Sequence, residues 1–200
     1  MAVSRIAIIG WGSLIWDLEI LSPHVAGGWL MAAGPQLPME FSRISPKRKM
    51  GLAVCLDPVA GVACQTHVIT SKRRDIHAAI EDLRARERAP VERIGACHPD
   101  LQHGRMPEVV EIMREWCAAN GWYGAVWTDL EPNFKAHTGQ GFSVARGMAY
   151  LKTLRGENLA EAHAYIENAP AQTHTPLRSA LRDDPWWSGL NKQAEQDRKA

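Results

Sequence analysis

The chain has 200 residues, of which 46% are hydrophobic and 22% charged, so it is long enough for one domain with a sizeable core. This composition excludes a disordered or fibrous protein. The 23 basic and 22 acidic side chains nearly cancel, and a chain without a bulk positive field is expected to bind neither nucleic acid nor an acidic membrane surface.

The chain is expected to be cytoplasmic and to form one domain over 1–188, followed by a polar tail over 189–200. No apolar stretch is long enough to cross a bilayer, and the apolar run at 6–9 is too short for a secretory signal. The four cysteines show no CxxC spacing, which indicates free thiols. The oligomeric state is left open by the sequence.

The first part of the chain is predicted to hold its strands. Residues 6–9 are typical of a short buried strand that runs into a glycine turn. Further strands are predicted at 39–45, 52–56 and 62–69. The last two are separated by turn residues, Asp-Pro and Ala-Gly, so we expect them to pair as a hairpin.

Next in the chain, the spacing of apolar residues changes to that of a helix. Ile76, Ile80 and Leu83 lie four and three residues apart, on one helical face. Ser71 is a suitable N-cap, and the helix is expected to end before Pro90.

The second part of the chain is predicted to be mainly helical. The expected elements are a helix from Pro107 to a stop at Gly121, a strand at 125–128, a helix after Ser143 that stops at Gly156, a helix around 159–166 and a last helix from Thr175. Strands followed by helices favour an α+β fold with an antiparallel or mixed sheet over a doubly wound parallel sheet.

The turn after the first strand, at 10–14, is the first candidate site (Gly10, Trp11, Gly12, Ser13 and Leu14). Two glycines allow backbone N–H groups to converge on a carboxylate or phosphate, although a plain tight turn would have the same sequence. A dinucleotide site is not indicated, because no third glycine follows and residues 14–16 are bulky. The segment also differs from the GxSxG motif of serine hydrolases.

Glu87 is the second candidate, because it continues the apolar face of the predicted helix after Leu83. A carboxylate at such a position either finds a donor or has a raised pKa, and a raised pKa suits a general acid or base. The alternative is that the helix frays near Pro90, so that Glu87 reaches solvent or pairs with Arg84 or Arg86.

Two further features are given no role. Cys97 and His98 are expected to lie in a surface loop without catalytic duty, and no zinc-like spacing accompanies them, so neither a metal nor a cofactor is predicted. The basic runs at 47–49 and 72–74 are interpreted as solvated charges.

Together the G-W-G-S-L turn and the later L-R-A-R-E segment, which ends at Glu87, resemble the γ-glutamylcyclotransferase-like superfamily over roughly the first half of the chain. The resemblance implies a small mixed or antiparallel β-barrel with flanking helices. One difference is that Trp11 stands where the family usually has Tyr, so that an indole N–H replaces a hydroxyl.

The resemblance also implies a reaction on a small-molecule γ-glutamyl substrate. The free α-amine attacks the side-chain amide carbonyl, releasing 5-oxoproline and an amine or amino acid, with no cofactor. Glu87 would then be the general acid/base, the backbone of the 10–14 turn would hold the α-carboxylate, and Trp11 and Trp16 would line the cleft. The competing hypotheses are a non-catalytic module that binds a small molecule or peptide in the same cleft, and a thiol enzyme that uses Cys97.

Overall fold

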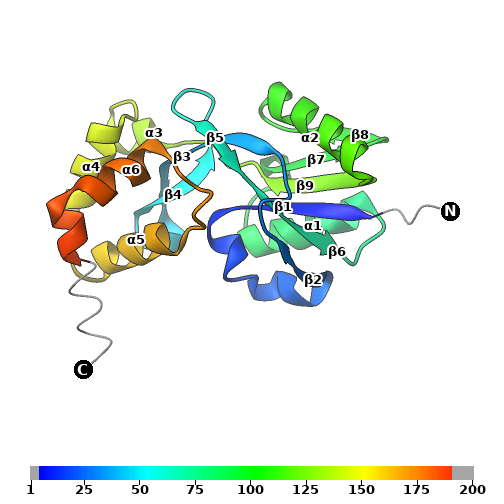
Figure 1. Ribbon diagram of the computed structural model, residues 1–200, viewed down its shortest axis with the longest axis horizontal. Coiled ribbons are helices and arrows are strands. Elements are labelled where there is room, and N and C mark those ends of the chain that lie inside the picture. Colours follow the sequence, from blue (N-terminus) through cyan, green and yellow to red (C-terminus); the bar gives the residue numbers. More distant parts are fainter. Residues whose placement is uncertain (1–4, 191–200) are drawn as a thin grey trace.

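A computed structural model describes residues 5–190 of the chain and contains two β-sheets with helices around them (Figure 1). The larger sheet has six strands. Their spatial order is β2 (Val25–Leu30), β6 (His67–Ser71), β1 (Ile6–Gly10), β9 (Gly124–Thr128), β7 (Ile94–His98) and β8 (Leu101–His103). Strands β1 and β9 run parallel and the other neighbours are antiparallel, so the sheet is mixed.

The smaller sheet has three antiparallel strands, with the long β3 (Gln36–Ser45) between β4 (Gly51–Leu56) and β5 (Val62–Gln65). Both sheets are open at their edges, and the strands within 5–190 form no closed barrel. The α+β class with a mixed sheet is therefore confirmed.

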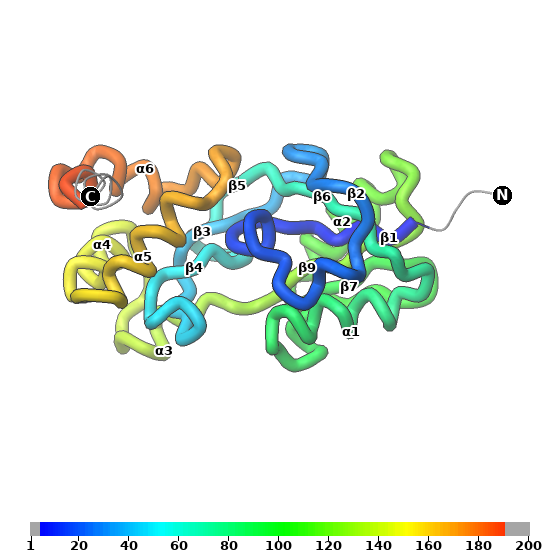
Figure 2. The backbone as a smooth tube through the Cα atoms, turned by 90° about the horizontal axis from the view of Figure 1, so that it is seen from below, coloured from blue at the N-terminus to red at the C-terminus, as the bar shows by residue number. Residues whose placement is uncertain are grey.

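The helices divide into two groups (Figures 1 and 2). Helices α1 (Ile76–Glu87) and α2 (Pro107–Asn120) pack on the six-stranded sheet. The second group gathers beside the three-stranded sheet and contains α3 (Phe134–Thr138), α4 (Val144–Thr153), α5 (Gly156–Asn168) and α6 (Pro176–Asp183).

Strand β1 is buried on both faces, which explains its continuous apolar sequence. Ile6 and Ile8 belong to the core cluster that contains the apolar face of α1. Ala7 and Ile9 point the other way, into the cluster that contains α2, the three-stranded sheet and the later helices. The strand is thus the layer between the two parts of the core.

Several predicted elements are confirmed with small changes of boundary. Helix α2 begins at Pro107 and ends at Asn120, directly before Gly121, which has a φ of 69°. Strand β9 and the helices after Ser143 and Thr175 are also present. Gly156 does not stop α4, which already ends at Thr153, but opens α5 instead.

The predicted hairpin between 52–56 and 62–69 is wrong. Strands β4 and β5 pair with opposite edges of β3 and not with each other. The second run is also split at Thr66, where the chain leaves the small sheet and enters the large one as β6. The Thr66 hydroxyl donates to the carbonyl of Pro35 at 2.6 Å, which holds this crossing point.

The predicted N-cap of the first helix is also wrong. Ser71 ends strand β6, and its hydroxyl accepts a hydrogen bond from the backbone N–H of Arg73. Helix α1 is capped instead by Asp75, whose carboxylate accepts from His77 and Ala78. An aspartate satisfies the free N–H groups of a first turn as well as a serine does.

The predicted tail over 189–200 falls almost entirely on 191–200, outside the described residues. Within 5–190, no helix has both the length and the apolar character that crossing a membrane requires.

Candidate functional site

The glycine turn forms where β1 ends. Trp11 is extended, and residues Gly12–Ile15 make a short 3-10 turn whose N-terminus is capped by no side chain from the described part of the chain. Gly12 has a φ of 57°, and a Cβ there would lie 2.7 Å from the hydroxyl oxygen of Tyr165. Gly10 is needed for a different reason, because a Cβ there would overlap the ring of Trp29.

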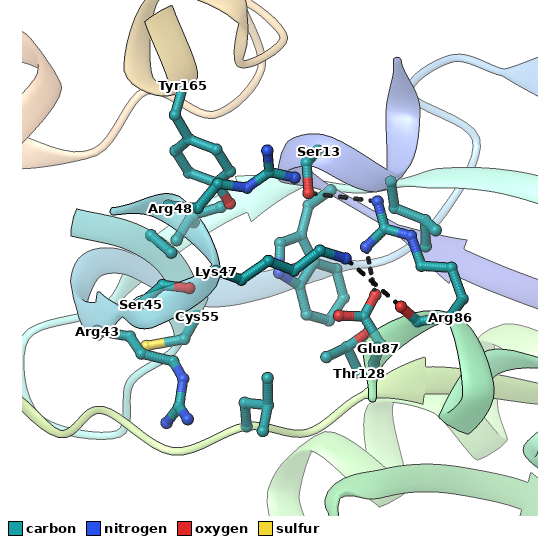
Figure 3. Close-up of a pocket in the computed structure, with 15 residues that line it drawn as sticks. Ser13, Arg43, Ser45, Lys47, Arg48, Cys55, Arg86, Glu87, Thr128 and Tyr165 are labelled. Atoms are coloured by element: carbon teal, nitrogen blue, oxygen red, sulfur yellow. Dashed lines mark hydrogen bonds and ion pairs between the residues drawn. The ribbon is translucent and has the colours of Figure 1, made fainter. Parts of the chain in front are cut away.

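A cavity of about 80 Å³ lies against this turn (Figure 3). The turn contributes Trp11, Ser13 and Leu14 to its walls, and the end of α1 contributes Glu87. The structure therefore brings together the two candidate sites, although they are more than 70 positions apart in the sequence. Gly10 and Gly12 shape the turn behind this wall.

Glu87 reaches the cavity from the last turn of α1. Its side chain is 12% exposed, and Oε1 accepts from Nη1 of Arg86 at 2.8 Å. The expectation that a carboxylate here finds a donor is thus met by pairing with its neighbour. The helix remains ordered up to Glu87, and the carboxylate faces the cavity rather than bulk solvent.

Arg86 holds the end of α1 against the glycine turn. Its side chain is only 2% exposed, and Nη2 donates to the carbonyl of Asp17 at 2.6 Å and to the hydroxyl of Ser13 at 3.4 Å. This guanidinium spans the gap between the two candidate sites and fixes the orientation of Glu87. From the sequence, Arg86 is expected only as a possible ion-pair partner of Glu87, and its contacts with the turn are not predicted.

Cationic side chains from the end of β3 and the turn after it form the opposite wall. Lys47 pairs with Glu19 at 2.6 Å, and Arg48 pairs with Glu161 at 3.2 Å. Arg43 also lines the cavity. The interpretation of 47–49 as solvated charges is therefore wrong for Arg48, whose side chain is 16% exposed at the cavity, whereas Lys47 borders the cavity but is itself exposed.

Tyr165 extends from α5 to complete the site. Burial raises the pKa of its hydroxyl to about 12, with the nearby charge of Arg48 opposing part of that rise, so the phenol stays protonated. The guanidinium of Arg48 lies over its ring at 5.2 Å, and Trp16 packs edge-on at 5.6 Å. Trp16, expected to line the cleft, does not border the cavity but packs against Tyr165.

Cys97 and His98 do not lie in a loop, as predicted, but end strand β7, and both are buried. Strand pairing with β8 and β9 accounts for this difference. The His98 ring accepts a hydrogen bond from the backbone of Asp100. Over the range 5–190, no three histidine, cysteine or acidic side chains gather as a metal site would require.

Comparison of the chain with protein-family models, with curated proteins and with solved structures finds no match.

Proposed function

We propose that the chain is a γ-glutamylcyclotransferase-like enzyme that converts a γ-glutamyl compound into 5-oxoproline and a free amine or amino acid. The α-amine of the substrate forms a bond to its own side-chain carbonyl carbon, and the bond from that carbon to the leaving nitrogen breaks. Glu87 takes a proton from the attacking amine and returns one to the leaving nitrogen, so the carboxylate is regenerated. Because the attack is intramolecular, positioning of the substrate supplies much of the rate.

The observation that supports this proposal most is the shared cavity of Glu87 and the 10–14 turn. An acid held at 12% exposure faces a wall that contains Ser13 and Leu14. Uncapped N–H groups at the start of the turn are suited to a carboxylate. In the proposed complex they bind the substrate α-carboxylate, while Arg86 keeps Glu87 aimed at the reacting amine.

The basic wall supports an acidic substrate. Arg43, Lys47 and Arg48 border the cavity together with Arg86, whereas Glu87 is its one acidic lining residue within 5–190. Lys47, Arg48 and Arg86 are each paired with a carboxylate, whereas Arg43 has no carboxylate partner among the described residues. The remaining positive charge favours an anion over a neutral molecule. The proposal includes a fold related to that of the family, with two open sheets and their helices in place of a closed barrel.

Tyr165 provides a hydroxyl in this cavity. Trp11, which stands where the family usually has Tyr, provides none. The hydroxyl oxygen of Tyr165 lies beside Gly12, and its high pKa keeps the proton available for donation. In the proposed mechanism this group donates to the substrate and limits its rotation before ring closure.

The experiment that tests the proposal is incubation of the purified protein with γ-glutamyl peptides and γ-glutamyl amines, followed by measurement of 5-oxoproline. Glu87→Gln keeps the size and hydrogen-bonding capacity of the side chain but removes the base. We expect product formation to fall by about 100-fold or more.

Glu81→Gln is the matched control, since Glu81 lies on the same helix, pairs with Arg84 on the surface and is 55% exposed. This variant should keep full activity. If no γ-glutamyl compound yields 5-oxoproline but some raise the melting temperature, the non-catalytic binding module replaces the enzyme. If Glu87→Gln retains activity, Glu87 is not the base.

A further inference from the structure

A second groove lies between α2 and β7, on the face of the six-stranded sheet opposite α1. It has a volume of about 310 Å³, and Cys97 and Cys117 both line it. We call it the α2–β7 groove, defined by these two cysteines together with Arg114, Gln102, Trp122 and Tyr123. None of these residues borders the cavity of Glu87.

The two thiols are neighbours, although 20 positions separate them in the sequence. Cys97 is the fourth residue of β7, and Cys117 lies on the buried face of α2, which packs on that strand. Both side chains line the same groove, so the two thiols face one shared space. A disulfide between them would bring the two sulfur atoms to about 2.05 Å of each other.

The surroundings make the two thiols unequal. The neighbouring Cys117 thiol, aided by the charge of Arg114, lowers the pKa of Cys97, while burial and the charge of Glu111 oppose part of this shift. The neighbouring Cys97 thiol, together with burial, raises the pKa of Cys117. A thiol that loses its proton more readily, sharing a groove with one that loses it less readily, is the arrangement of an attacking and a resolving cysteine.

We infer that Cys97 and Cys117 form a dithiol site that exchanges with small-molecule disulfides entering the α2–β7 groove. The Cys97 thiolate attacks one sulfur of the small disulfide, forming a mixed disulfide and releasing one thiolate. Cys117 then loses its proton and attacks the Cys97 sulfur, which releases the second thiolate and closes the Cys97–Cys117 disulfide. The protein dithiol is oxidised by two electrons, the small disulfide is reduced to two thiols, and the two protein protons pass to them.

The remaining cysteines serve as internal controls. Burial raises the pKa of Cys55 to about 12 and that of Cys64 to about 11. Neither lines the α2–β7 groove. They are therefore expected to stay unreacted while the chain is folded.

The test uses the fully reduced whole protein, freed of reductant and incubated without oxygen with hydroxyethyl disulfide as the probe. Remaining thiols are then alkylated and mapped by peptide mass spectrometry. We expect a Cys97–Cys117 cross-link, two released equivalents of mercaptoethanol per protein, and alkylation of Cys55 and Cys64 only after unfolding. Equal reactivity of all four cysteines, or reaction only in denaturant, would overturn the inference. Because this experiment uses the unmodified protein, its outcome does not depend on whether a variant folds.

Two single variants separate the roles of the thiols. Cys117→Ser should stop at the mixed disulfide on Cys97, because nothing resolves it. Cys97→Ser should leave Cys117 unmodified over the same time. Modification of both variants at the same rate would contradict the assignment of Cys97 as the attacking thiol, and circular dichroism of each variant verifies that it is folded.

Discussion

At the scale of single residues, Gly12 and Tyr165 are fitted to each other. The tyrosine hydroxyl occupies space that any side chain at position 12 would need, and Val54 closes the same space from β4. The backbone of Gly12 is also left-handed, a conformation that glycine adopts without strain. Two independent reasons therefore favour glycine at position 12: its backbone conformation, and the lack of space for a side chain between Tyr165 and Val54.

Gly12→Ala is expected to destabilise the fold by about 2 to 4 kcal/mol, since it adds backbone strain to a steric overlap. Its Cβ would lie 2.7 Å from the Tyr165 oxygen and 2.8 Å from a methyl group of Val54. Gly27→Ala is the matched control, because Gly27 has a φ of 72° but no atom within 4 Å of its Cβ position. Urea denaturation measures both variants, and equal losses would show that the overlap with Tyr165 has no cost.

Tyr165→Phe removes only the oxygen, so it tests the same contact from the other side. Combined with Gly12→Ala, it should give a loss smaller than the sum of the two single variants, by about 0.5 kcal/mol or more. Strict additivity in this double-mutant cycle would contradict direct contact between residues 12 and 165.

At the scale of elements, Glu40 joins strand β3 to helix α6. Its carboxylate is 1% exposed and accepts from the backbone N–H of Phe41 at 2.7 Å and of Leu177 at 3.2 Å. Leu177 is in the first turn of α6, where N–H groups lack partners within the helix. One buried acid thereby links the start of a helix to a strand more than 130 residues earlier.

Burial raises the pKa of Glu40 above its usual value of 4.5, although hydrogen bonds from Thr175, Phe41 and Leu177 oppose part of the rise. The folded state therefore binds the proton more tightly than the unfolded state does. The stabilisation from this proton is full below pH 4.5 and is lost as the pH rises through the folded-state pKa.

Glu40→Gln removes this titration while keeping an oxygen acceptor. The free energy of unfolding of the variant relative to the native protein should therefore increase from pH 4.5 upward. Urea denaturation at a series of pH values measures the difference, in which the titration of all other groups cancels. A difference that stays constant with pH would mean that the pKa of Glu40 is the same in the folded and unfolded states.

Elements with a clear pattern of their own could be predicted from the sequence, whereas those that depend on distant partners could not. Helix α2 carries its proline start, its apolar face and its glycine stop within its own residues. Strand β2 contains two adjacent glycines and is mostly exposed, so its pairing with β6 leaves no local signal. The hairpin prediction failed similarly, because β3 lies between the two strands that a short turn appeared to join.

The residues of the candidate site likewise fall into those that a local sequence pattern predicts and those that depend on distant partners. Glu87 could be singled out because it interrupts an apolar helical face, and the 10–14 turn because glycines flank a tryptophan. Tyr165 has no such signal, since an aromatic residue on the buried face of a helix usually indicates core packing. Only the close approach of α5 to the glycine turn brings its hydroxyl to the cavity.

At the scale of the whole molecule, one core joins the two sheets. The cluster that contains Ala7 of β1 and Trp127 of β9 also contains Leu37 of β3 and Ile166 of α5. Because this cluster is continuous over both sheets and the later helices, neither the six-stranded sheet nor those helices can be exposed without opening the shared core. The predicted single domain over 1–188 can be tested through this continuity.

We therefore expect the described part of the chain to unfold as one cooperative unit. Native-state hydrogen exchange measures the opening free energy of each backbone amide, and the slowest amides of β9 and of α5 should share one value, equal to the global free energy of unfolding. Leu37→Ala, at a fully buried position near the start of β3, should lower both values equally, by about 2 to 5 kcal/mol. If α5 instead opened at a much lower free energy than β9, the C-terminal helices would be a separate unit, and Tyr165 would leave the cavity whenever that unit opened.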